Sequence, residues 1–169
     1  LYHKIIKHTE AYCDQEHIDM IILNHASVPD RTKAILEGNE DSVISVLKED
    51  IRLLEGCGVS HIAIPCNTSH SFFEKLKENA KANIINMVEE TVSDIALKGR
   101  KKACIMCTEG TLKMGLYKKE CIKRNIEYVE PDEEIKKLTM SLIYEQIKKG
   151  EKGNLEDFNK VTGWFKNKG

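Results

Sequence analysis

The sequence predicts an α/β protein in which parallel strands alternate with helices along the chain. Short β-branched apolar runs recur, and each is followed within a few residues by a segment with helical spacing of apolar side chains. Strands that are separated by a helix usually pair in parallel through right-handed crossovers, so this order favours α/β layers. The 169 residues suffice for one domain or two small ones. Gly99 is the best boundary, and it divides the chain into residues 1–98 and 99–169.

The first part of the chain shows helical periodicity and β-branched runs in alternation. Val43, Leu47 and Ile51 share one face of a predicted amphipathic helix, and two glycines follow it as a stop signal. Its predicted elements are a helix over 1–13, a strand over 19–24, a loop over 26–32, a helix over 41–56, a strand over 60–65, a helix over 67–80, and a short strand followed by a helix within 83–99.

The second part repeats the same alternation. Asn154 is a predicted N-cap, because an asparagine side chain accepts hydrogen bonds from the free N–H groups of a first helical turn. The predicted elements are a strand over 101–106, a loop to 111, a helix within 112–125, a strand over 126–131, a helix over 132–150, and a helix from 154 to the end of the chain.

Composition excludes several classes of protein. The net charge of −1 provides no basic field for nucleic acid. No apolar run reaches the roughly 20 residues of a membrane-spanning helix, and no secretory signal is visible. Six cysteines in a chain that is neither short nor loop-rich indicate reduced thiols rather than a disulfide framework. We therefore expect a cytoplasmic protein that acts without a nucleic-acid or membrane partner.

The strongest candidate for chemistry is Cys66, in the segment "IPCNTSH". It follows the predicted strand over 60–65, and functional groups gather at the carboxyl ends of parallel strands. Asn67, Thr68 and Ser69 then form the first turn of the next helix, where free N–H groups and the helix dipole lower the pKa of a thiol and bind a carboxylate. A buried structural cysteine at a strand end is the alternative.

Other cysteine and histidine patterns predict less. Cys66 and His70 have a spacing that can share a metal, but no second pair with finger spacing follows, so we expect no metal. Cys104 and Cys107 form a CxxC that lies within a strand rather than at a helix start, which disfavours a redox role. No phosphate loop supports a pyridoxal phosphate enzyme, and we expect no cofactor.

Five segments, in order, resemble motifs of the aspartate/glutamate racemase family, the cofactor-independent amino-acid racemases. "IPCNTSH" is similar to the family's PCNT(A/S)H, and "CTEGTLKMGLYKKE" to its TxGTxxSGxYxxE stretch. The Pro-Asp-Arg segment and the helix lysine most resemble aspartate racemases. The remaining matches are "NHASVPDRT" over 24–32, "INMVEET" over 85–91 and "IYEQIKKG" over 143–150.

This resemblance implies two similar parallel-sheet α/β halves with the active site in the cleft between them. One thiolate removes the Cα proton of aspartate, or of glutamate, while an opposing thiol protonates the other face. Cys66 matches the first catalytic thiol, and Arg31 and Lys148 match cations near the side-chain carboxylate. The family also suggests a homodimer. The further substrate-binding candidates are Asn24, Asn67, Thr68 and Thr111.

The chain departs from the family pattern at both ends. The family begins with a strand and a glycine-rich loop, and it ends with a strand and a GCTE segment that carries the second thiol; neither is present in residues 1–169. We therefore expect that the chain is a fragment, with Cys107 as a less favoured replacement base. The alternatives are a hydantoin racemase or maleate isomerase, and a catalytically inactive protein that binds small acids.

Overall fold

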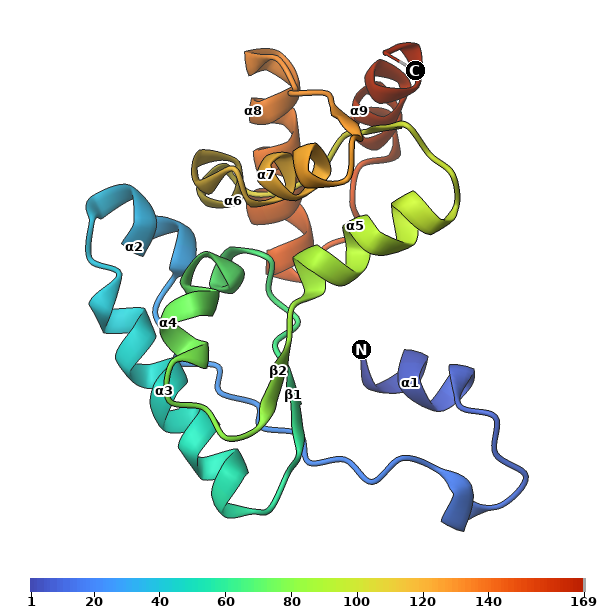
Figure 1. The fold of residues 1–169 in the computed structure, drawn as a ribbon. Helices are drawn as coiled ribbons and strands as arrows, with labels where there is room; N and C mark the ends of the chain where they lie inside the picture. The colour runs from blue at the N-terminus through green and yellow to red at the C-terminus, as the bar shows by residue number, and fades with distance from the viewer. Residues whose placement is uncertain (169) are drawn as a thin grey trace.

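The computed structural model describes residues 1–168, and Gly169, which the sequence analysis included in the last helix, lies outside the described residues. Helices and short strands alternate along the chain, as predicted (Figure 1). The α-helices and strands are α1 (Tyr2–His8), α2 (Arg31–Glu37), α3 (Asp41–Gly56), β1 (His61–Ala63), α4 (Phe73–Lys77), β2 (Asn83–Ile85), α5 (Met87–Leu97), β3 (Lys102–Ala103), α6 (Glu109–Met114), α7 (Leu116–Lys123), β4 (Glu127–Tyr128), α8 (Glu133–Ser141) and α9 (Leu155–Asn167).

Two small parallel sheets organise the molecule. β1 pairs with β2, with Ile62 opposite Ile84, and β3 pairs with β4, with Ala103 opposite Tyr128. Both pairs are parallel and both are connected through helices, which confirms the predicted α/β class. The sequence predicted longer strands over 60–65 and 101–106; the strands lie within these ranges but span three and two residues.

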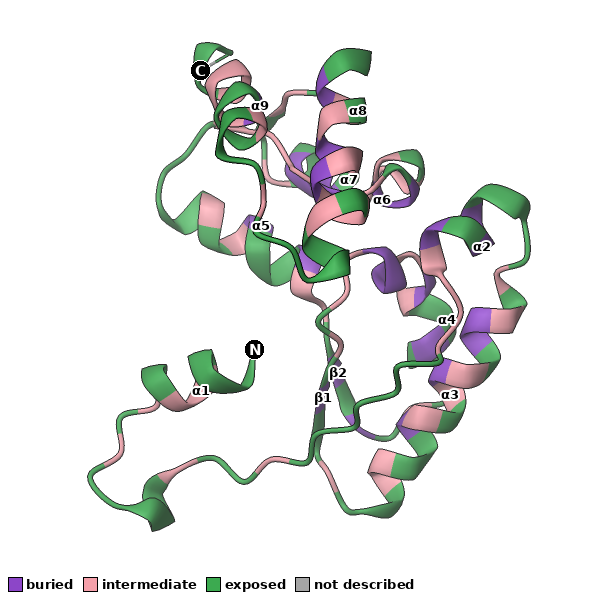
Figure 2. Cartoon of the chain, turned by 180° about the vertical axis from the view of Figure 1, so that it is seen from behind, coloured by how far each residue is buried: buried purple, intermediate pink, exposed green. Residues whose placement is uncertain are grey.

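Three hydrophobic clusters form the core. The first packs α2, α3 and α4 around β1 and β2, and the apolar face predicted for α3 is buried against it (Figure 2). The second joins α5 and α7 to β4 through residues such as Val92 and Cys121, and the third joins α8 to α9 through Ile135 and Val161. α5 therefore packs against elements that follow it in the chain. The division into 1–98 and 99–169 stays a prediction.

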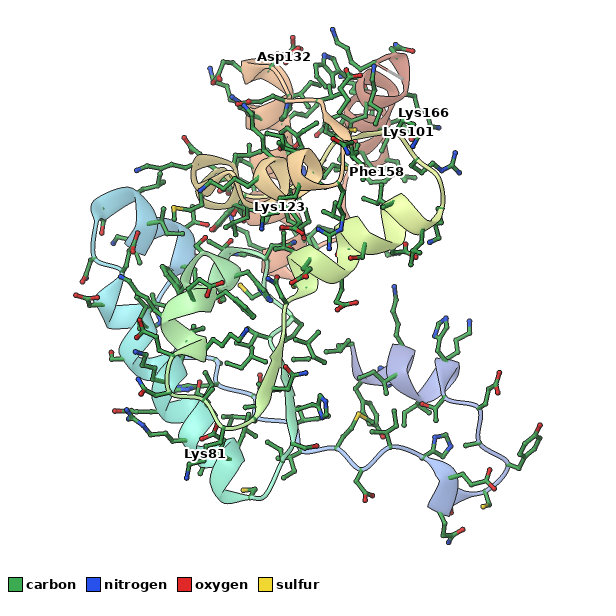
Figure 3. The ribbon with its side chains drawn as sticks, viewed as in Figure 1. Lys81, Lys101, Lys123, Asp132, Phe158 and Lys166 are labelled. Carbon is green, nitrogen blue, oxygen red and sulfur yellow. The ribbon has the colours of Figure 1, made fainter. Side chains whose placement is uncertain are left out.

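The predicted strand over 19–24 is wrong. This segment forms no ladder with any strand among the described residues, and Ile21 and Ile22 are exposed. A β-branched run becomes a strand only when a neighbouring backbone satisfies its N–H and C=O groups, so composition alone was not sufficient. α1 and the segment after it project from the rest of the molecule, as the side chains in Figure 3 show.

Two helical regions also differ from the prediction. Arg31 and Thr32, the last two residues of the predicted loop over 26–32, instead begin α2, because Asp30 caps the helix by accepting a hydrogen bond from the Lys33 N–H. The helix predicted over 132–150 is α-helical only to Ser141, after which a π-helical turn and a 3-10 turn lead to Gly150 in the left-handed region, at φ +80°. Such π turns are frequent at functional sites. None of the helices within residues 1–168 is long and apolar enough to cross a membrane.

Candidate active site

Cys66 lies three residues beyond the end of β1 and two residues before the start of a 3-10 turn over Thr68–Phe72. Its N–H donates to the Ile64 carbonyl at 2.7 Å, which makes a tight bend. Burial raises the pKa of the Cys66 thiol, but hydrogen bonds from the Ser69 hydroxyl and N–H, together with Arg31, outweigh burial and lower it below the ordinary value. These groups stabilise the thiolate, which is the reactive form of cysteine.

His70 fixes the backbone of the Cys66 bend from behind. The ring is buried, and its Nδ1 lies 2.9 Å from the Cys66 carbonyl oxygen. A carbonyl only accepts, so Nδ1 carries the hydrogen, and Nε2 accepts from the Met87 N–H at 3.2 Å. His70 therefore connects the thiol segment to the first residue of α5.

Four threonine hydroxyls join the elements that surround the thiol. Thr68 Oγ1 lies 2.9 Å from Thr108 Oγ1 and 3.1 Å from Thr111 Oγ1, and Thr32 donates to Thr108 at 3.2 Å. Thr108 is the N-cap of α6. α2 and α6 approach each other closely beside this cluster. A Cβ added to Gly110 of α6 would lie only 3.1 Å from the Thr32 Cα of α2. The cluster holds the start of α2 against the start of α6.

Charged side chains lie at the start of α2 and in the turns after α8. Arg31 Nη1 donates to the carbonyls of Val28 and Pro29 at 3.0 and 2.9 Å. Lys148 Nζ lies 3.5 Å from Asp30 and 3.8 Å from the centre of the Tyr144 ring. Burial raises the pKa of Asp30, but the Lys33 N–H, Lys148, Tyr144 and Arg31 together hold it below its ordinary value.

These groups surround one pocket of about 200 Å³. The first part of the chain contributes the thiol and the residues at the start of α2, and the later part contributes the loop after β3 and the π-helical segment. The lining residues are Asp30, Arg31, Thr32, Cys66, Asn67, Thr68, Met106, Cys107, Thr108, Ile143, Tyr144 and Lys148.

The structure brings most of the predicted site residues together in this pocket. Cys66, with the candidate substrate-binding residues Arg31, Asn67, Thr68 and Lys148, lines its wall. The other two lie elsewhere. Thr111 is buried behind Thr68 and contacts it through a hydroxyl–hydroxyl hydrogen bond, whereas Asn24 is exposed and lies outside the pocket lining.

Sequence reasoning missed four polar residues that line the pocket, which are Asp30, Thr32, Thr108 and Tyr144. Asp30 stands beside Arg31 in the Pro-Asp-Arg segment, and its place before a helix was a signal for a capping carboxylate. Thr108 is the N-cap of α6, and a threonine three residues before Thr111 at a strand-to-helix junction carries the same signal. Tyr144 had no local signal, because it reaches the pocket only through the π-helical turn.

Cys107 also lines the pocket, but its environment differs from that of Cys66. The side chain is buried, and burial raises the pKa of its thiol to about 12. It is therefore protonated at neutral pH, and a pKa this far from neutral is poorly matched to either donating or removing a proton. Among residues 1–168, no three His, Cys, Asp or Glu side chains lie close enough to share a metal ion.

The fold and the pocket together define an α/β protein with a thiol of lowered pKa beside two cationic side chains. The sequence pattern described as Asp/Glu/hydantoin racemase matches residues 1–160, and the chain belongs to this family. This confirms the resemblance that the five motifs indicated.

Relatives and solved structures agree with this assignment. The broad specificity amino-acid racemase RacX of Bacillus subtilis (strain 168) is 34% identical over 79 residues, which are 47% of this chain and 34% of that protein. The aspartate racemase of Picrophilus torridus superposes with a TM-score of 0.74 at 29% identity, over 85% of this chain and 59% of that one. A Yersinia pestis protein assigned as an Asp/Glu racemase shares the fold, with a TM-score of 0.80 at 20% identity over 99% of this chain and 74% of that one.

Proposed function

We propose that the full-length protein is an amino-acid racemase that interconverts L- and D-aspartate, with glutamate as an alternative substrate, by proton transfer between thiols and Cα without a cofactor. The observation that carries this proposal is a thiol whose pKa is lowered, Cys66, in a pocket lined by the cations Arg31 and Lys148. Family membership supports the reaction class. The cytoplasmic location and the homodimer stay predictions.

In the proposed reaction, the Cys66 thiolate removes the Cα proton and becomes a thiol. The electron pair left on Cα then takes a proton from a thiol on the opposite face, which becomes a thiolate. Two groups on opposite faces are needed because inversion requires the proton to return from the other side. The Cα–H is a weak acid, so hydrogen-bond donors around the substrate must stabilise the negative charge that develops.

The carboxylates of an acidic amino acid match the donors in the pocket. Arg31 is suited to bind the side-chain carboxylate with two parallel hydrogen bonds, and Lys148 adds a second cation. Asn67 and Thr68 are suited to bind the α-carboxylate, and Thr111 supports Thr68 from behind. We assign no pocket contact to Asn24, since it lies outside the lining.

A racemase of broader specificity is the second candidate. Asp30 lies 3.5 Å from Lys148 and offsets part of its charge, which weakens the preference for a side-chain carboxylate. The Bacillus subtilis relative, itself a broad specificity racemase, favours the same reading for this chain. The ratio of kcat/KM for aspartate to kcat/KM for a neutral amino acid such as alanine separates the two candidates.

The test is racemisation of L-aspartate by the full-length protein, followed by circular dichroism with no pyridoxal phosphate added. Proton NMR in deuterated water reports exchange at Cα independently. Cys66→Ser should abolish racemisation, because a serine hydroxyl is far less acidic than a thiol and is a poor base near neutral pH. Cys107→Ala asks in the same assay whether Cys107 supplies the second proton. Full racemisation by the Cys66→Ser variant would overturn the proposed mechanism.

A further inference from the structure

A tyrosine from the later part of the chain holds the side chain of Asn67. The Tyr117 hydroxyl, on α7, donates to Asn67 Oδ1 at 2.5 Å across fifty positions of sequence. Tyr117 is 5% exposed and packs in the second hydrophobic cluster with Val88, Val92 and Ile126. Its position is therefore set by the core and not by the pocket, so it provides a rigid anchor for a residue of the pocket wall.

The hydrogen bond decides which end of the amide a ligand meets. An asparagine side chain has one oxygen that accepts and one NH2 group that donates. Tyr117 already occupies Oδ1, while the structure records no protein acceptor for the Asn67 NH2 group among residues 1–168. Because Asn67 lines the pocket, the group left for a ligand there is a hydrogen-bond donor.

We infer that Tyr117 is a positioning residue, which holds the Asn67 amide so that it donates to a carboxylate of the amino acid in the pocket. The identity of that ligand rests on the function proposed above. An amide turned the other way would place an acceptor oxygen against the carboxylate and repel it. Tyr117 therefore favours ligands that carry an acceptor at this position, although it touches no ligand itself.

The burial of Tyr117 supports the direction of this hydrogen bond. A buried hydroxyl needs an acceptor for its hydrogen, and Asn67 Oδ1 lies 2.5 Å from the Tyr117 hydroxyl oxygen, while the Thr91 hydroxyl is a second hydrogen-bond partner of Tyr117. Burial also raises the pKa of Tyr117, so the phenol keeps its proton at pH values where the Cys66 thiolate forms.

A double-mutant cycle on the full-length protein tests the inference through kcat/KM for L-aspartate. Asn67→Ala removes a hydrogen bond to a charged group and should lower kcat/KM by about 10- to 100-fold. Tyr117→Phe leaves the amide free to rotate and should lower it by about 3- to 10-fold, mainly through KM. In the Asn67→Ala background, Tyr117→Phe should change kcat/KM by less than about 2-fold, because no amide remains to be held.

Tyr128→Phe is the matched control, since Tyr128 packs against the same hydrophobic cluster but does not line the pocket. It should leave kcat/KM unchanged. Equal losses from Tyr117→Phe in both backgrounds would overturn the inference and leave Tyr117 with a structural role only, whatever the racemase activity.

Failure of the proposed function gives a different result. If the full-length protein does not racemise aspartate, the same cycle is measured on the affinity for succinate by calorimetry. Coupled losses there support the positioning role without racemase activity. Additive losses, or no binding of succinate by the unaltered protein, overturn it.

Discussion

Gly110 offers the sharpest test of how α2 and α6 position the site. A Cβ at this position would lie 3.1 Å from the Cα, 3.2 Å from the Oγ1 and 3.3 Å from the Cβ of Thr32. Favourable carbon contacts lie at about 3.5–4.0 Å, so a Gly110→Ala substitution requires movement of several tenths of an ångström. The nearest atom belongs to the backbone and cannot rotate away, and α2 must therefore shift as a whole.

A second glycine isolates this effect. Gly163, within α9, has no atom within 4 Å of an added Cβ, so Gly163→Ala should stabilise the protein by up to about 1 kcal/mol through helix propensity. Gly110→Ala receives a similar gain but also crowds Thr32, which typically costs about 1–3 kcal/mol. The propensity gains largely cancel between the two variants, and their difference should be that crowding cost of about 1–3 kcal/mol.

Calorimetry of the full-length variants measures this difference. It corresponds to a Tm roughly 2 to 12 °C lower for Gly110→Ala than for Gly163→Ala. Arg31 is the first residue of α2, so the same shift should displace it from Cys66. Small misplacements in an active site cost up to about 100-fold in rate, and we expect racemisation to fall at least about 10-fold in Gly110→Ala alone. Equal stability and activity of the two variants would refute the reasoning.

Three further predictions concern the pocket. The Cys66 thiol should react with iodoacetamide at lower pH than an ordinary cysteine, and it should lose this reactivity as the pH falls through its lowered pKa. Arg31→Ala should move the pH profile of the reaction to higher pH, as measured by mass spectrometry of the Cys66 peptide. An unchanged profile would show that Arg31 does not stabilise the thiolate. Asp30→Asn keeps a good helix cap but removes the negative charge beside Lys148, so the KM for aspartate should fall by about 2- to 5-fold. A higher KM would contradict the view that Asp30 offsets part of the Lys148 charge. His70→Asn keeps a donor near the Cys66 carbonyl and His70→Gln does not, so the Asn variant should retain several-fold more activity. Both variants should lose about 1–3 kcal/mol of stability. A higher kcat for the Gln variant would argue against a role for the hydrogen bond between His70 and the Cys66 carbonyl.

Local sequence alone determined much of the secondary structure and the chemistry of the thiol. The apolar face of α3 was readable because helical spacing is a property of neighbouring residues. The Asn154 cap was equally local, and its Oδ1 accepts from the N–H groups of Glu156 and Asp157 as predicted. The place of Cys66 after a strand and before a helical turn followed from the same kind of evidence.

Tertiary structure decided which of these residues meet. Asp30 reaches Lys148 and Tyr117 reaches Asn67 across long stretches of chain, because α2 and the π-helical segment line one pocket and α7 contacts the pocket residue Asn67. Residues 19–24 show the converse, since their β-branched composition predicted a strand that lacks a pairing partner among the described residues. Helical periodicity and helix caps depend on residues that are neighbours in sequence. Strand pairing and site geometry depend on contacts between residues far apart in sequence, and a local sequence pattern does not identify these partners.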